Sequence, residues 1–501
     1  MMSLISACRL RVYLPVISVL FILFTAQCGL QDSDDTPAVP DTMVNPDGDG
    51  GDQSAPTWYQ DIQALVATNC RQCHFSGGPT NSTFESYETT RGLASLIATY
   101  AETRDMPPWP ADSTDECVPR HAFKDDMRLT SDEIALFRAW ADADAPEGDA
   151  DTAAPFDDPV SQQLDEVTHS VGLADFGYSW SVGSEQTSDD YRCFSLDPAI
   201  SSDKWLDAVE VIPYTDDESD PAKRLKDIVH HVVLFLDLEG TSGDIETDDG
   251  GSYSCVGGPG LTTGFTVTGF WAPGSKPFVI PAGGAIKVPA GARIVMQMHY
   301  HPQGEANTDA VTSLNLHMVD EAPERKVEMR VKGAVVSAPG LLPGPNDADP
   351  DSPEFLIPNG AIDHTEEMIV PLPELDNLSD DVDVRLWSVF PHMHYVGTDM
   401  LVRLQHEDDD DDCLVQTPRW DFDYQYIYQY DTPLVDGVRL RAGDSLYLRC
   451  TYTNDATLNP GLAEGIANDE LISETTDTWL GEGTLDEMCV VIVGVSYPHS
   501  P

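Results

Sequence analysis

Basic side chains are scarce in this sequence: 27 Lys and Arg stand against 86 Asp and Glu in 501 residues. A nucleic-acid-binding surface needs clustered positive charge to neutralise phosphates, so this composition excludes a nucleic-acid-binding protein. Part of the acidic excess lies in runs at 32–35 and 407–412, which are typical of solvated surface or loops. The chain is long enough for two to four domains with sizeable cores.

Long apolar runs are also missing after the N-terminus, so no later segment is predicted to cross a membrane. The N-terminus has Arg9 and Arg11 before a short apolar segment, 12–24. This order of charge and apolar residues predicts a signal peptide over residues 1–27, and therefore an exported protein.

Residues 25–28 (Thr-Ala-Gln-Cys) resemble the cleavage box of bacterial lipoproteins, with Cys28 as the lipidated residue. Gln27 departs from the small residue usual at its position, so cleavage without lipid stays open. Residues 28–55 have few apolar side chains and are expected to be a disordered acidic tether. We expect a periplasmic or cell-surface protein of a bacterial envelope that touches the membrane only through this lipid.

A haem-attachment motif, Cys-x-x-Cys-His, follows a predicted helix over 57–69. Cys70 and Cys73 have the spacing for two thioether bonds to haem c, and His74 for the axial ligand beneath the iron. The alternatives are a redox disulfide and half of a zinc site, but no second Cys pair follows to complete zinc coordination.

The sixth haem ligand is expected to be Met106, because the prolines that follow it would hold its loop stiffly. Met127 is the rival ligand. A last helix is predicted from Thr130, with Glu133 completing a capping box. Helix, haem box, Met loop and helix together resemble a small class I cytochrome c covering residues 56–148.

No long helical stretch follows the linker at 149–164. Short alternating runs separated by Gly, Pro and Asp turns predict strands instead. The clearest are 209–212, 231–236, 293–301, 382–390 and 446–452. The aromatic alternation in 420–430 predicts one more strand with a buried face. The fold class is therefore mostly β, with two β-sandwich domains at 165–322 and 323–501 after the small all-α domain.

Histidines and methionines recur in pairs and triplets in this β region. His392 and His394 share one side of an extended strand, because side chains alternate with period 2. His230 and His231 are adjacent, so they can share a metal only where a strand begins or bulges. Of the residues on the 293–301 strand, either His299 or His301 could join them.

Residues 165–501 resemble the copper type II, ascorbate-dependent monooxygenases, the family of peptidylglycine α-hydroxylating and dopamine β-monooxygenases. The resemblance rests on the His230-His231 pair, on His299 before Tyr300, on His392-x-His394, and on the string Asp486-Glu487-Met488-Cys489. It implies two jelly-roll sandwiches, each with one copper, facing across a solvent-filled cleft.

The resemblance assigns the first copper to His230, His231 and His299, and the second to His392, His394 and Met488. Three imidazoles suit both copper oxidation states, whereas a thioether favours Cu(I). It implies hydroxylation of a C–H bond with O2 at the second copper, so His392, His394 and Met488 are the expected catalytic residues. The electrons would come from ascorbate or another one-electron reductant, such as an external donor acting through the fused haem c.

The resemblance also implies two disulfides, Cys193 with Cys255 and Cys450 with Cys489. Cys117 and Cys413 have no assigned partner. The two expected disulfides and these two cysteines together account for the six cysteines outside the signal, the lipid box and the haem motif. An even number of cysteines fits an oxidising compartment.

Two positions depart from the peptide-amidating members of the family. Phe390 stands where they have an Arg that grips a peptide carboxylate, and Val490 stands where they have Asn. We therefore expect a small, neutral or apolar substrate. The alternative function is a non-catalytic copper-binding or electron-transfer lipoprotein.

Overall fold

The computed structural model describes residues 55–499, apart from 77–79, 81, 157–162, 187–188, 214–227, 249, 274, 303, 305, 336, 345–346, 373–381, 408–409, 469–474 and 484. The predicted signal peptide, Cys28 and all but the last residue of the tether lie outside these residues. No helix within the described part is long and apolar enough to span a membrane.

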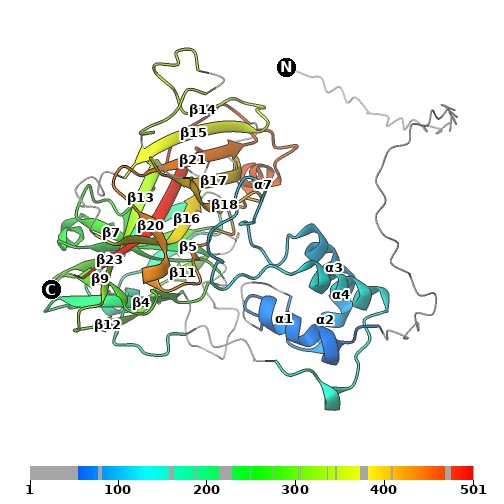
Figure 1. Ribbon diagram of the computed structural model, residues 1–501. Helices are drawn as coiled ribbons and strands as arrows, with labels where there is room; N and C mark the ends of the chain where they lie inside the picture. The colour runs from blue at the N-terminus through cyan, green and yellow to red at the C-terminus, as the bar shows by residue number, and fades with distance from the viewer. Residues whose placement is uncertain are drawn as a thin grey trace, which may run out of the picture. The chain divides into compact units, whose positions relative to one another are not determined.

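The helices gather at the start of the described chain (Figure 1). They are η1 (Trp58–Ile62), α1 (Gln63–Asn69), α2 (Tyr87–Thr90), η2 (Arg91–Leu93), α3 (Ala94–Thr103) and α4 (Ser131–Asp142). Their apolar faces form a separate core that includes Trp58, Phe137 and Trp140. We call residues 56–106 and 129–148 the helical unit.

Both predicted helices are present, with one difference at the first. α4 begins with the predicted capping box: the Glu133 N–H donates to Thr130 Oγ1 at 3.3 Å, and the Thr130 N–H donates to Glu133 Oε2 at 2.7 Å. Thr57 precedes η1 but caps no helical N–H group, because its hydroxyl donates to Gln60 Oε1 at 2.6 Å instead.

Most of the regular secondary structure in the rest of the described chain is strand, which confirms the predicted mostly β class. The largest sheet has the order β1 (His169–Gly172), β12 (Ser313–Val319), β4 (Lys204–Ile212), β9 (Gly284–Val288), β13 (Arg325–Ala334), β23 (Cys489–Pro498), β16 (Val384–His392), β19 (Tyr428–Gln429), with β8 (Phe278–Val279) on β4 and β20 (Val438–Leu440) on β16.

Two further sheets pack against this one. The first has the order β6 (Tyr253–Ser254), β3 (Asp190–Leu196), β10 (Arg293–Tyr300), β5 (Val229–Asp237), β7 (Phe265–Trp271), and the second β15 (His364–Pro371), β21 (Ser445–Tyr452), β17 (Gly397–Gln405), β18 (Asp412–Gln416). Short elements complete the fold: α5 (Leu173–Phe176), α7 (Pro460–Asn468), η3 (Ala150–Thr152), η6 (Thr241–Asp244), η7 (Leu434–Asp436), and the pairs β2 (Trp180–Val182) with β11 (Asn307–Asp309) and β14 (Leu356–Ile357) with β22 (Thr478–Trp479).

Two apolar cores lie between these sheets. One is built mainly from strands before residue 330 and the other mainly from strands after it. We call 165–322 the first half and 323–501 the second half. The two halves share the largest sheet, because β13 of the second half pairs in parallel with β9 of the first, Arg325 opposite Gly284.

The strand predicted over 420–430 is wrong except at its end, where Tyr428–Gln429 form β19. Residues 420–427 form turns and loop. The aromatic residues of 420–430 still pack into the fold. The side chains of Phe422, Tyr428 and Tyr430 are buried in the core of the second half.

Three disulfides lie in the described chain. Cys193–Cys255 and Cys450–Cys489 confirm the two expected pairs, with Cα–Cα distances of 5.8 and 5.9 Å. The third joins Cys117 to Cys413, 296 residues apart, and accounts for the two cysteines without an assigned partner. All three suit an oxidising compartment.

Candidate metal centres

The first histidine group forms where two neighbouring strands of one sheet meet. His231 on β5 lies opposite His299 on β10. The next pair in the register is Tyr300 with Val229, so the strand bulges at His230. The bulge turns His230 to the same side as His231, and one nitrogen from each of the three rings lies within 4.8 Å of the others.

The Nδ1 atoms of these rings face one another. His231 Nδ1 lies 3.1 Å from His230 Nδ1 and 3.3 Å from His299 Nδ1. The far nitrogens meet carboxylates: His230 Nε2 is 3.0 Å from Asp423, and His299 Nε2 is 3.0 Å from Asp189. A carboxylate behind an imidazole fixes the ring orientation and raises its basicity, as is usual in metal sites.

Burial favours the neutral form of His231 and His299, the form that binds metal. Burial and the neighbouring His299 and His230 rings lower the pKa of His231 well below its usual value. Burial likewise lowers the pKa of His299 to about 4. Of the two candidates for the third histidine, His299 belongs to the group. His301 lies outside it, and its Nδ1 contacts Asp189 at 2.7 Å.

Asp423 comes from the loop of the second half, yet it holds a ring of the first-half group. We predict that Asp423→Asn weakens copper binding by the first group about 10-fold, because His230 loses its carboxylate partner. A copper titration of the purified protein measures the change. Asp431→Asn, at an exposed position nearby, is the control. Equal loss in both variants would contradict a specific role for Asp423.

The second group lies at the end of β16. The rings of His392 and His394 are 5.1 Å apart and nearly perpendicular. Each Nδ1 is already bonded, His392 to Gln425 Oε1 at 2.7 Å and His394 to the Asp486 carbonyl at 3.0 Å. Each Nε2 is therefore the nitrogen left for a metal. Burial lowers the pKa of both rings, that of His394 to about 3.

Met488 is tied to this group through its neighbour Glu487, whose carboxylate is fully buried. Glu487 Oε2 accepts the N–H groups of His394 at 2.9 Å and Met488 at 3.0 Å. Its Oε1 accepts those of Val396 at 2.8 Å and Gly397 at 3.1 Å. Burial raises the pKa of Glu487 to about 8, against the effect of these four donors. One carboxylate thus holds the loop of His394 to the segment of Met488.

Aromatic rings lie between the two groups. The Phe422 ring is 5.9 Å from the His230 ring and 6.0 Å from the His394 ring. Phe270 lies 5.6 Å from His231 and packs at 5.0 Å against Phe390, the residue two before His392. The expected solvent-filled gap is therefore at least partly filled by side chains.

The haem motif lines a cavity of about 610 Å³. Cys70, Cys73, His74 and Met106 all reach it, whereas Met127 is not among its lining residues and contacts Gln72 instead. The wall opposite includes His230, His299, His301, Tyr395, Asp423 and Tyr424. The haem motif and the first histidine group therefore open onto one space.

The residues of this cavity are compatible with haem c. Cys70 and Cys73 form no disulfide, and burial raises the pKa of their thiols to about 12 and about 11, unlike a reactive redox pair. His74 Nδ1 contacts the Ser82 carbonyl at 3.0 Å, leaving Nε2 for an iron. The His74 ring also stacks on Phe84 at 4.1 Å.

We predict that Met106→Leu lowers the haem reduction potential by on the order of 0.1 V, because a thioether opposite His raises it. Met127→Leu should leave the potential unchanged, since Met127 lies off the cavity. Spectroelectrochemical titration of the haem-loaded protein measures both. A lowered potential in Met127→Leu together with an unchanged potential in Met106→Leu would instead identify Met127 as the ligand.

No family model and no curated protein matches this sequence. Among solved structures, the major capsid protein P2 from Bacteriophage PM2 aligns with 62% of this chain and 98% of its own, at 11% identity and a TM-score of 0.22. Allantoicase aligns with 55% of this chain and 81% of its own, at 11% identity and a TM-score of 0.16. Both scores are too low to bear on function.

Proposed function

We propose that this protein is an exported copper-dependent monooxygenase that hydroxylates a C–H bond of a small neutral or apolar substrate. The observation that carries the proposal is the pair of imidazole groups, three rings in one and two rings beside a methionine segment in the other. Nitrogen and thioether donors of this kind suit copper. Bound copper would supply one-electron redox chemistry and activation of O2.

The residues of the chain divide this work between the two groups. His230, His231 and His299 would hold the copper that stores and passes an electron. His392, His394 and Met488 would hold the copper at which O2 reacts, with the thioether favouring the reduced ion. The balance is R–H with O2, two electrons and two protons giving R–OH and water.

The aromatic rings beside the second group support an apolar or neutral substrate. Phe390 is buried and packs on Phe270, so no cation stands there to bind a peptide carboxylate. A substrate screen under ascorbate should give faster turnover of neutral compounds than of a glycine-extended peptide. Comparable rates would refute this substrate class.

The helical unit supports a second part of the proposal. In this part, electrons reach the first group from haem c rather than directly from ascorbate. The shared cavity of His74, Met106 and His230 favours it. The three disulfides support export, and we propose a lipid on Cys28 in a bacterial envelope.

A non-catalytic electron-transfer protein is the alternative function, and the aromatic packing between the two groups favours it. Copper and haem stoichiometry on the exported protein, followed by product analysis under O2, separates the two. The monooxygenase requires two copper ions, one haem and a hydroxylated product. Full metal content with no product in a broad screen would leave electron transfer.

A further inference from the structure

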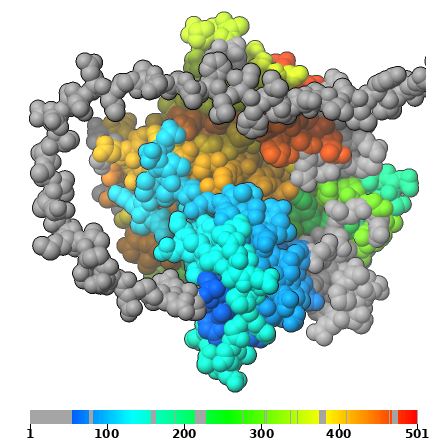
Figure 2. Space-filling view, turned by 90° about the vertical axis from the view of Figure 1, so that its right-hand side faces the viewer, coloured from blue at the N-terminus to red at the C-terminus, as the bar shows by residue number. Residues whose placement is uncertain are grey.

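The segment that connects the two parts of the helical unit lies on the β region. Residues 107–128, which we call the strap, run from the residue after Met106 to the residues before α4. The strap contains no helix, and Figure 2 shows its light blue atoms against orange atoms of the second half. Its backbone pairs there repeatedly: Asp112 N–H with the Gln416 carbonyl at 3.0 Å, and Lys124 N–H with the Gln429 carbonyl at 2.8 Å.

Covalent and aromatic contacts join the same surfaces. The Cys117–Cys413 disulfide links the strap to β18. Trp109, at 6% exposure, packs on Tyr428 at 5.2 Å and on Tyr426 at 5.3 Å. The Tyr426 hydroxyl donates to the Pro108 carbonyl at 3.0 Å, two residues from the expected haem ligand Met106.

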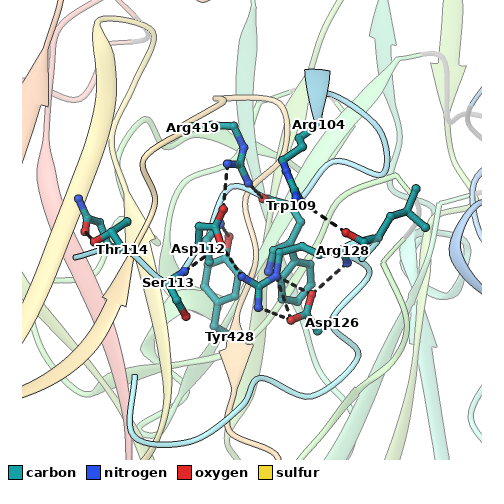
Figure 3. A network of polar contacts seen from close by, with 12 residues as sticks. Arg104, Trp109, Asp112, Ser113, Thr114, Asp126, Arg128, Arg419 and Tyr428 are labelled. Atoms are coloured by element: carbon teal, nitrogen blue, oxygen red, sulfur yellow. Dashed lines mark hydrogen bonds and ion pairs between the residues drawn. The ribbon is translucent and has the colours of Figure 1, made fainter. Parts of the chain in front are cut away.

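Charged groups complete the attachment (Figure 3). Arg419 of the second half contacts Asp112 at 3.0 Å, and Arg128 bridges Asp112 and Asp126 within the strap. Lys276 of the first half meets Asp125 at 2.7 Å. The strap therefore binds both halves of the β region.

We propose that the strap fixes the helical unit in place, so that the haem-binding residues stay beside the first histidine group without any swing about the 149–164 linker. Cys117, Cys413, Trp109 and Asp112 are positioning residues in this scheme. The consequence for electron transfer rests on the proposed function, whereas the fixed attachment does not.

Distance measurements test the attachment itself. Spin labels at Ser95→Cys on α3 and Val435→Cys in η7, both exposed positions, report the separation in the haem-loaded full chain. We expect a single narrow distance distribution that added salt does not change. The distance distribution should broaden at least twofold in the triple variant that combines Cys117→Ser, Cys413→Ser and Asp112→Ala. Val118→Ser, at 71% exposure on the strap, is the matched control and should stay narrow.

Viscosity tests the consequence. After flash reduction of the haem by an external photoreductant, the rate at which ferrous haem passes one electron to cupric ion should not change with added glycerol. An electron-transfer rate that falls in proportion to viscosity would overturn the proposal, and so would a broad distance distribution in the protein with an unaltered strap. Both results can be obtained even if the triple variant fails to fold. A narrow distribution without any electron leaving the haem would instead count against the proposed function.

Discussion

Replacing His231 by alanine is expected to remove one of the two copper ions that the proposed function requires, and with it the proposed hydroxylation. His231 is central to the first group, because its Nδ1 faces both His230 and His299. Two imidazoles alone hold copper far more weakly than three, so the metal content should fall from two to one per chain. Elemental analysis after gel filtration measures this.

The stability of the same variant separates ligation from folding. Bound metal stabilises the wild type by about 2.7 kcal/mol per site when its free concentration is 100 times Kd. His231→Ala should lose that increment at one site, while its metal-free form should unfold within about 1 kcal/mol of the wild type. The reason is that burial leaves His231 neutral, so no ion pair is lost.

His169→Ala is the control for this experiment, since His169, at the start of β1, lies outside both groups and its Nδ1 is 3.0 Å from Thr168 Oγ1. It should keep two copper ions and full activity. Retention of two ions by His231→Ala would contradict the first centre.

Local sequence patterns were sufficient for the features set by backbone periodicity. The two-residue spacing of His392 and His394 predicted that their rings would lie close together, and they are 5.1 Å apart, although β16 ends at His392 and His394 lies in the loop after it. The rule that adjacent histidines need a bulge predicted the geometry now seen at His230. The capping box at Thr130 was equally local and was found as expected.

Features that depend on contacts distant in sequence could not be predicted. Asp423 reaches His230 across 193 residues, and Cys117 reaches Cys413 across 296. No spacing or periodicity encodes such pairings. The aromatic alternation of 420–430 was misleading for the same reason: a strand face and a loop packed on the strap bury the same residue types.

Glu487→Ala is expected to have the largest effect on stability of any single substitution proposed. It would leave three buried N–H groups without an acceptor, those of His394, Val396 and Met488, and would leave Gly397 with only the His394 carbonyl at 3.3 Å. Each orphaned donor costs about 1–3 kcal/mol, less where water enters the space, so the free energy of unfolding should fall by roughly 3–5 kcal/mol. Denaturant titration of the metal-free protein measures the loss.

The isosteric variant Glu487→Gln tests whether the carboxylate also sets the second centre. Its amide oxygen can still accept one pair of N–H groups, but its NH2 group would face the other pair as donor against donor. Stability should therefore fall by less than in Glu487→Ala, while copper at the second group weakens and the first group keeps its ion. Glu321→Ala, at an exposed position between β12 and β13, controls for the loss of an acidic side chain outside both groups. Glu487 would be only a folding residue if Glu487→Gln bound two copper ions as tightly as the wild type, because the segment of Met488 would then need no carboxylate to stay beside His394.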